Sequence, residues 1–191
     1  QEKNLKYLIK DYSKKQIPKY ATHLFACGKE AGKWMFGKHK FQIMNNAIDA
    51  KKFIYNEEVR KQKRVELGVE DKFVIGHVGR FNLQKNHEFL VKRFADFAKT
   101  NEDAILVLIG NGELQEKIKE MAKEYGIETK VKFLGLREDI PQLLQAMDLF
   151  LFPSLFEGLP VTLVEAQAAG LPCVISDMIT DEIMITDQIS K

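Results

Sequence analysis

The chain has 191 residues, of which 45% are hydrophobic and 29% are charged, so it can form one substantial domain and its composition excludes disordered and fibrous proteins. No apolar run approaches the ~18 residues that a membrane-spanning helix requires. Cys27 and Cys173 form neither a metal-binding spacing nor a disulfide framework, and they indicate reduced thiols in a cytoplasmic protein.

The net charge of +2 conceals an uneven distribution. Residues 1–66 contain 16 Lys and Arg against 7 Asp and Glu, whereas the remaining 125 residues contain 13 against 20. A basic segment can meet anionic lipid or nucleic acid, and peripheral contact with a membrane surface stays open. Because aromatic residues are not regularly interleaved with the basic ones, we favour a solvated face and expect no nucleic-acid partner.

The first third of the chain predicts a different unit from the rest. Residues 21–26 and 41–44 resemble strands with a helix over 29–36 between them, and the turn-rich segment 45–49 follows. We therefore interpret residues 1–45 as the remnant of an upstream domain. Residues 46–71 then form a linker that contains a helix over 57–67.

From residue 72 onward, short apolar runs alternate with amphipathic segments. We predict strands over 72–79, 104–109, 130–134, 149–152 and 172–175. The helices between them are predicted over 86–99, 114–125, 140–146 and 162–169. Fully apolar strands in this order predict an α/β domain, a Rossmann-like doubly wound parallel sheet over residues 72–191.

Ligands of such sheets bind beyond the carboxyl ends of the strands, so the loops there are the candidate site. Arg80 and Lys85 follow the first predicted strand and precede a helix, whose N-terminus favours anions. Two cations there can balance the charge of a diphosphate leaving group where no metal does. The alternative is that both are ordinary solvated surface cations.

The loop after the fourth predicted strand carries Glu157, then Gly158-Leu159-Pro160, and leads into a helix with Glu165. Glycine lets the backbone approach a ligand, and the helix start offers free N–H groups to phosphate. Either carboxylate can accept hydrogen bonds from vicinal sugar or ribose hydroxyls. Alternatively, Glu165 only closes a capping box that starts at Thr162, and Glu157 is an ordinary loop carboxylate.

Other chemistries find little support. The four histidines lack metal-ligand spacing, so no metal site is predicted. No Walker loop and no complete Gly-x-Gly-x-x-Gly is present, which disfavours P-loop kinases and dinucleotide oxidoreductases. We expect His77, in a buried strand, to be a core histidine whose hydrogen bonds are satisfied.

Four segments together resemble glycosyltransferase family four, whose members are GT-B enzymes of polysaccharide and lipopolysaccharide biosynthesis. They are residues 77–86, 107–113, 131–135 and 152–165. The last contains Glu157 and Glu165 in the spacing of the family's Glu-x7-Glu motif. The resemblance covers about residues 41–177, and Asn46-Ala-Ile-Asp49 is similar to the interdomain Asn-Gly-Ile-Asp, with Ala47 replacing glycine.

The resemblance implies a metal-independent, retaining hexosyltransferase whose C-terminal Rossmann-like domain binds a nucleotide-sugar donor. UDP is the favoured nucleotide, GDP is a second candidate, and no further cofactor is implied. Arg80 and Lys85 would neutralise the diphosphate, Glu157 would contact the transferred sugar, and Glu165 the ribose. The other implied donor-site residues are Gly79, Gly110, Leu136, Gly158, Leu159, Pro160 and Val161.

The resemblance also implies that a saccharide or lipid-linked acceptor binds to an N-terminal domain at the cytoplasmic side of a membrane. We expect this chain to be a piece of a longer enzyme, truncated at its C-terminus and inactive alone. Two alternatives stay open: a non-catalytic nucleotide-sugar-binding module, and another GT-B enzyme such as a sugar-nucleotide epimerase. The paired glutamates favour the transferase over the epimerase.

Overall fold

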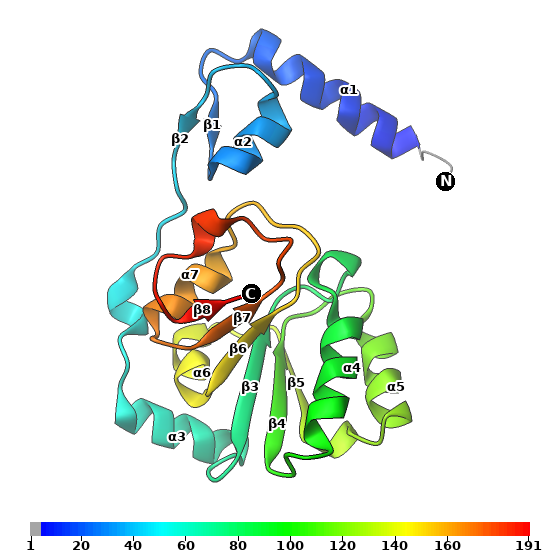
Figure 1. Ribbon diagram of the computed structural model, residues 1–191, viewed down its shortest axis with the longest axis vertical. Coiled ribbons are helices and arrows are strands. Elements are labelled where there is room, and N and C mark those ends of the chain that lie inside the picture. Colours follow the sequence, from blue (N-terminus) through cyan, green and yellow to red (C-terminus); the bar gives the residue numbers. More distant parts are fainter. Residues whose placement is uncertain (1–4) are drawn as a thin grey trace.

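The computed structural model describes residues 5–191, so the first four residues of the predicted remnant 1–45 lie outside the described part (Figure 1). The α-helices are α1 (Leu5–Tyr20), α2 (Lys29–Phe36), α3 (Glu57–Leu67), α4 (His87–Ala98), α5 (Gln115–Glu124), α6 (Ile140–Ala146) and α7 (Val161–Ala168). The strands are β1 (Phe25–Ala26), β2 (Gln42–Ile43), β3 (Phe73–Val78), β4 (Ala104–Ile109), β5 (Val131–Gly135), β6 (Leu149–Phe152), β7 (Cys173–Ile175) and β8 (Ile189–Ser190). Short 3-10 helices are η1 (Ala50–Phe53), η2 (Leu83–Lys85), η3 (Glu128–Lys130) and η4 (Asp181–Ile183).

The larger part of the chain forms a six-stranded parallel sheet in the order β5-β4-β3-β6-β7-β8. The chain adds strands outward from β3 to β5, then returns to place β6 on the other side of β3. This is the strand order of the doubly wound Rossmann sheet, with its topological switch point between β3 and β6. The predicted fold class is confirmed, and every predicted strand and helix from residue 72 onward is present within a residue or two.

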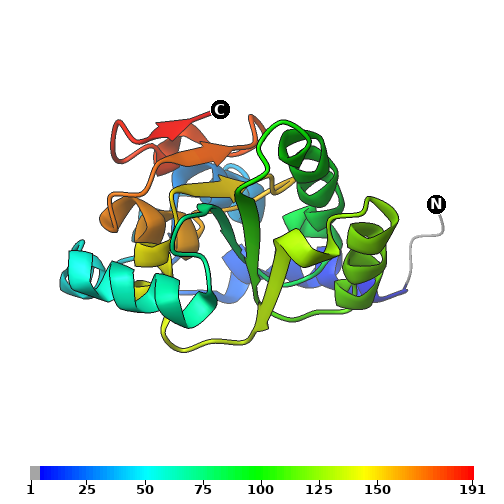
Figure 2. The same ribbon diagram turned by 90° about the horizontal axis from the view of Figure 1, so that it is seen from below.

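The sheet is covered on both faces (Figure 2). Because side chains alternate along a strand, successive residues of β4 enter two different cores. Ile105, Val107 and Ile109 pack with α6 and α7, whereas Leu106 and Leu108 pack with α4 and α5. Two-sided burial explains why β4 is apolar at every position.

One α-helix and one strand were not predicted from the sequence. Helix α1 has charged and apolar residues around most of its circumference, no acidic residue in its first turn and a proline, Pro18, near its end. It therefore lacks the segregated stripe that marks an amphipathic helix. Strand β8 has two residues, too few for any periodic pattern.

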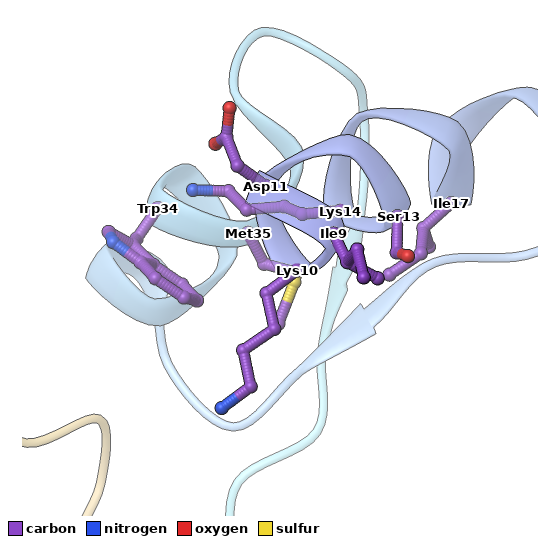
Figure 3. Close-up of a pocket in the computed structure, with 8 residues that line it drawn as sticks. All are labelled: Ile9, Lys10, Asp11, Ser13, Lys14, Ile17, Trp34 and Met35. Carbon is purple, nitrogen blue, oxygen red and sulfur yellow. The ribbon is translucent and has the colours of Figure 1, made fainter. Parts of the chain in front are cut away.

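The N-terminal segment, residues 5–44, is a small unit in which β1 and β2 pair in parallel around α2. Helix α1 packs against α2, and a cavity of about 410 Å³ lies between them (Figure 3). Trp34 and Met35 of α2 form one wall, while Ile9, Lys14 and Ile17 of α1 belong to the other.

This segment lies at the end of the molecule opposite α3 (Figure 1). Its α2 is attached to the larger sheet domain by Glu182, whose carboxylate accepts hydrogen bonds from the backbone N–H of Lys29 (2.7 Å) and Glu30 (3.1 Å). These backbone hydrogen bonds hold the pKa of Glu182 below its ordinary value. Asn46 makes a second connection to the sheet domain, because its Nδ2 donates a hydrogen bond to the carbonyl of Leu159 at 2.8 Å.

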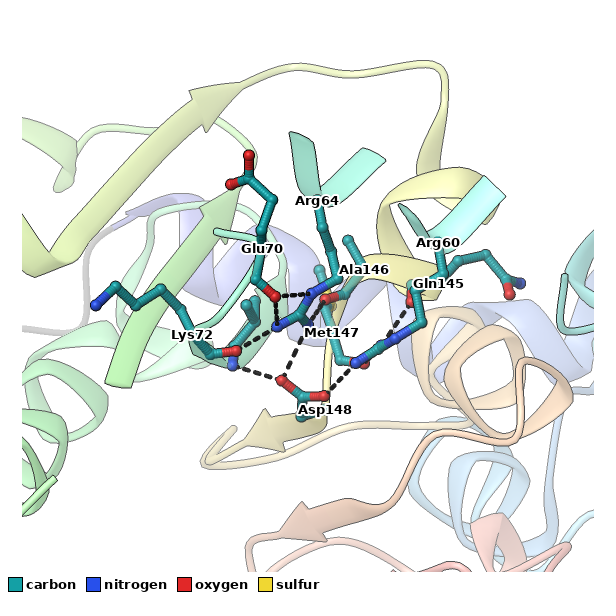
Figure 4. Close-up of polar contacts among 9 residues, drawn as sticks. Arg60, Arg64, Glu70, Lys72, Gln145, Ala146, Met147 and Asp148 are labelled. Atoms are coloured by element: carbon teal, nitrogen blue, oxygen red, sulfur yellow. Dashed lines mark hydrogen bonds and ion pairs between the residues drawn. The ribbon is translucent and has the colours of Figure 1, made fainter. Parts of the chain in front are cut away.

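At the amino ends of the strands, Arg60 and Arg64 of α3 converge on Asp148 (Figure 4). Asp148 also accepts a hydrogen bond from the backbone N–H of Val74 at 2.7 Å, which joins β3 to the start of β6. Arg64 is buried and donates to the carbonyls of Glu70, Lys72 and Ala146. The cluster therefore holds α3, the helix of the predicted linker, against the sheet. It lies at the opposite end of the strands from the loops that carry the candidate site.

Candidate functional site

The loops after β3 and β6 lie side by side, because their strands are neighbours at the switch point. The backbone N–H of Leu155 donates to the carbonyl of Gln84 at 2.9 Å, and the Gln84 amide donates to the carbonyl of Phe156 at 2.9 Å. Asn86 adds a bond to the carbonyl of Pro153 at 3.2 Å. The two loops predicted to carry the chemistry are thus joined into one surface.

Lys85 and Glu157 form an ion pair at the centre of this surface. Lys85 Nζ lies 2.8 Å from Glu157 Oε1, with side chains only 16% and 10% exposed. The same Nζ lies 4.5 Å from the ring centre of Phe152. Asn82 caps η2 by accepting from the backbone N–H of Lys85 at 3.1 Å, which fixes where this side chain begins. Because both side chains are largely buried, little water screens the pair.

Arg80 lies on the same loop but is exposed. Its guanidinium contacts Glu113 Oε2 at 3.2 Å, with the two side chains 70% and 58% exposed. An ion pair so exposed is weak, and the guanidinium can leave it for a stronger anion at little cost. The sequence predicted Arg80 as a site residue but gave no sign of its partner Glu113.

A cavity of about 350 Å³ opens beside Arg80, where the loops after β3, β4 and β5 meet. Gly79, Gly110 and Leu136 line it together with Arg137. Gly110 has φ +135°, and a Cβ atom there would lie 2.1 Å from the carbonyl oxygen of Gly79. Only glycine permits this approach of the two loops. Leu136 is 79% exposed at the rim, so an incoming planar ring could cover it.

Helix α7 begins at Val161, with Pro160 as its N-cap residue and no side-chain cap. The first N–H groups of a helix have no carbonyl in a preceding turn, so those of Val161 and Thr162 are available to an anion. Leu159 is buried, and its carbonyl accepts a hydrogen bond from Asn46.

The capping-box interpretation of Glu165 is wrong. Thr162 lies inside the helix, and its hydroxyl is buried without a hydrogen-bond partner among the described residues. The carboxylate of Glu165 is partly buried and accepts no hydrogen bond from any group within residues 5–191. Burial raises its pKa above the ordinary value.

His77 and His87 lie beneath the Lys85 loop as a buried pair, with ring centres 4.7 Å apart. His77 Nδ1–H donates to the carbonyl of Leu151 at 2.8 Å, but His77 Nε2 and both nitrogens of His87 have no partner among the described residues. The expectation for His77 was therefore only half right. Burial is the main cause that lowers the pKa of His77 to about 3 and of His87 to about 4, so both rings are neutral near pH 7.

The structure places seven of the predicted residues in two neighbouring groups. Gly79, Arg80, Gly110 and Leu136 line the cavity beyond β3–β5, while Lys85, Glu157 and Gly158 adjoin the start of α7. Within residues 5–191, no three His, Cys, Asp or Glu side chains are grouped so as to hold a metal ion. Nor does any helix of that range combine the length and apolarity needed to cross a bilayer. The arrangement can balance a diphosphate with cations and helix N–H groups.

Comparison with known proteins gives consistent matches. Residues 58–187 match the family model described as "Glycosyl transferases group 1". The chain is 42% identical over 169 residues to the putative glycosyltransferase EpsF of Bacillus subtilis (strain 168), covering 85% of this chain and 44% of that protein. It is 34% identical over 143 residues to the UDP-Gal:alpha-D-GlcNAc-diphosphoundecaprenol alpha-1,3-galactosyltransferase of Escherichia coli, covering 73% and 37%.

Among solved structures, Anabaena Alr3699/HepE in complex with UDP-glucose is similar with a TM-score of 0.80 and 25% identity. That similarity covers 92% of this chain and 50% of the Anabaena chain. This chain spans less than half the length of the two curated relatives above. The fold is that of the C-terminal half of a GT-B enzyme, as predicted. With the family model matching more than half of its residues, the chain belongs to the glycosyl transferases group 1 family.

Proposed function

We propose that this domain binds a nucleotide-diphosphate sugar and, within the longer enzyme, supports its transfer with retention to a saccharide or lipid-linked acceptor. The observation that carries the proposal is the largely buried Lys85–Glu157 pair at the switch point, flanked by Arg80 and the N-terminus of α7. The UDP-glucose complex of the Anabaena protein supports UDP over GDP as the nucleotide. The name of the Escherichia coli relative supports a lipid-linked acceptor.

We assign the site residues as follows. The base enters the cavity lined by Gly79, Gly110 and Leu136, and the ribose hydroxyls bind the unpartnered carboxylate of Glu165. The diphosphate draws Arg80 from its exposed pair with Glu113. The transferred sugar then binds Glu157 beside the backbone of Gly158 to Val161, in the manner of the Glu-x7-Glu motif of glycosyltransferase family four.

In the transfer step, Lys85 and Arg80 stabilise the negative charge that develops on the leaving nucleoside diphosphate. Lys85 is largely buried, so its charge acts through a medium less polar than water. Glu157 and the Phe152 ring keep the ammonium in place before the donor arrives, while Asn82 fixes the backbone of Lys85. No step requires a metal ion.

We also retain the proposed division of the chain into a remnant of the acceptor domain (1–45), a linker (46–71) and the donor domain (72–191). The bond from Asn46 to Leu159 supports a boundary at this point, because the linker begins against the donor loop.

The proposal is tested by isothermal titration calorimetry of the chain with UDP, GDP, ADP and their glucose conjugates. Binding of UDP in the micromolar to millimolar range, tighter than that of GDP and ADP, supports it. Failure of a folded chain, checked by circular dichroism, to bind any of the three diphosphates would rule it out.

Donor binding should survive removal of divalent metals. Two cations and the N-terminus of α7 already offer positive charge to the diphosphate. We expect the Kd for UDP to change less than about twofold in excess EDTA, a difference well below 1 kcal/mol. The calorimetric titration is repeated with EDTA and with added Mg²⁺. A strict requirement for Mg²⁺ or Mn²⁺ would contradict the assignment of the two cations.

Substitutions of the two glutamates should weaken the binding of different ligands. Glu165→Gln should weaken UDP and UDP-glucose alike, whereas Glu157→Gln should weaken UDP-glucose more than UDP. Burial raises the pKa of Glu165, so its ionised form costs folding free energy, and Glu165→Gln should not lower the Tm. Calorimetry and thermal unfolding of both variants check this. A lower Tm for Glu165→Gln with unchanged UDP affinity would make this residue structural.

A further inference from the structure

Helix α2 begins without a capping side chain of its own. Its N-cap residue is Gly28, which has an extended backbone (φ −164°, ψ 168°) and no side chain to accept a hydrogen bond. Ser, Thr, Asp or Asn usually holds this position, because a side-chain oxygen there accepts from the otherwise unpaired N–H groups of the first turn. In α2 the carboxylate of Glu182 accepts from these groups instead. The cap of α2 is therefore supplied by the sheet domain.

Glycine at position 28 suits this arrangement. A Cβ atom there would lie 3.1 Å from Glu182 Oε2, so a side chain would crowd the carboxylate. The hydroxyl of Thr180 donates to the other carboxylate oxygen, Oε1, at 3.4 Å and accepts from the backbone N–H of Glu182 at 3.3 Å. The carboxylate is thus oriented toward α2 before it makes the cap.

The loop that carries Glu182 is fixed to the sheet domain. Ile183, the next residue, is fully buried in the core. Gln167 of α7, also buried, donates to the carbonyl of Ile183 at 2.9 Å. Its amide oxygen accepts from the backbone N–H groups of Ile185 and Thr186 at 3.1 and 3.0 Å. Contacts between neighbouring groups therefore connect α7, whose N-terminus belongs to the candidate site, to the start of α2.

With the cap in place, the start of α2 lies against the loop after β6. A Cβ atom at Gly158 would lie 3.3 Å from Cys27 Sγ and 3.6 Å from Ala31 Cβ. Cys27 packs against the core of the sheet domain, although it belongs to the N-terminal segment. The residues at the start of α2 therefore cover one side of Gly158, the neighbour of Glu157.

We propose that the start of α2 is a cover over Gly158 and that Glu182 is the latch that holds this cover closed. Hydrogen bonds to a charged acceptor are stronger than those between neutral groups, so the two bonds from Lys29 and Glu30 hold the helix firmly. When the carboxylate releases them, α2 loses its cap and its attachment together. The helix start then moves away from Gly158 and exposes the thiol of Cys27. This inference goes beyond the proposed function and involves no nucleotide.

The rate at which a maleimide reacts with Cys27 measures how often the cover opens. Cys173 is the internal reference, because it is buried and burial raises the pKa of its thiol to about 12. Near neutral pH we expect slow reaction of Cys27 and none of Cys173, with the labelled peptides identified by mass spectrometry. Glu182→Ala should speed the reaction of Cys27 about 5-fold or more, the factor that loss of one helix cap typically gives.

Asp181→Ala is the matched control. Asp181 precedes Glu182 in η4 and is an exposed carboxylate paired with Lys191 at 2.6 Å, so its removal changes the charge of the same turn. It should leave the reaction of Cys27 unchanged. An unchanged rate in Glu182→Ala would overturn the latch. Equal acceleration of Cys173 would overturn it too, because the whole fold rather than the cover would then be opening.

Adding Gly28→Ser to Glu182→Ala separates capping from attachment. Serine can cap α2 from within, which stabilises the first turn but does not restore the bonds to the sheet domain. We expect amide hydrogen exchange in α2 to slow again while Cys27 stays reactive. If the serine also returned Cys27 to its original rate, Glu182 would only stabilise the helix, and the latch would be overturned. Because nucleotide is absent throughout, such a failure leaves the proposed donor site standing.

Discussion

Replacing both Arg80 and Lys85 with alanine should lower the affinity of the chain for UDP by at least about 100-fold. A hydrogen bond to a charged group contributes about 1.5–3 kcal/mol, and every 1.4 kcal/mol changes Kd tenfold. Two such bonds would give 100-fold at the lower limit. Calorimetric titration of UDP into the double variant measures the loss directly.

The two single variants should lower the affinity for UDP by unequal amounts. Lys85→Ala removes the cation and also leaves the largely buried Glu157 carboxylate without its partner, beside the incoming diphosphate. Arg80→Ala removes a cation that is mostly in water. We therefore expect Lys85→Ala to account for the larger share. Lys117→Ala is the control, since Lys117 is an exposed cation paired with Glu88 at 2.7 Å and should not affect UDP. A folded double variant with unchanged affinity would show that the diphosphate binds elsewhere.

Most of the fold could be predicted because its signals are local. Each strand from β3 to β7 is a short apolar run, each helix between them has an apolar stripe, and right-handed crossovers then leave few topologies. The exceptions are α1 and β8. They are stabilised by their neighbours rather than by patterns of their own, since β8 is formed by its pairing with β7.

The sequence predicted which loops form the candidate site but not which side chains contact one another there. Lys85 and Glu157 are 72 positions apart, and their pairing depends on β6 returning beside β3. The same holds for Glu182, whose cap on α2 spans 153 positions. Local reasoning also allowed a capping box at Thr162, which fails because the N-cap residue is Pro160, two positions earlier. His87 was missed although helical spacing puts it on the buried face of α4, three positions before Leu90 and seven before Phe94.

The Arg60–Arg64–Asp148 cluster leads to the largest expected effect on stability. Asp148→Ala would leave two guanidinium groups without their carboxylate partner and the backbone N–H of Val74 without its acceptor. Loss of one partner from a buried pair costs about 3–5 kcal/mol. Because the side chain of Asp148 is still 22% exposed, we expect about 2–4 kcal/mol.

For a chain of this length, a loss of that size should lower the Tm by roughly 4–16 °C. Asp103→Ala is the matched control: Asp103 pairs with Lys72 at 2.5 Å but is 73% exposed, so its loss should matter far less.

The pH dependence of the Tm gives a second readout. Burial opposes the charge on Asp148, but hydrogen bonds from Val74, Arg60 and Arg64 outweigh it and hold the pKa below its ordinary value. The stabilisation is therefore complete above the unfolded pKa of about 3.9 and is lost as pH falls through the lower folded value. The Tm difference between the wild-type chain and Asp148→Ala should accordingly be constant from pH 8 to about pH 5 and shrink only in stronger acid. If Asp148→Ala and Asp103→Ala lowered the Tm equally, the cluster would not be what holds α3 against the sheet. The same would follow if the Tm difference between the wild-type chain and Asp148→Ala shrank already near neutral pH.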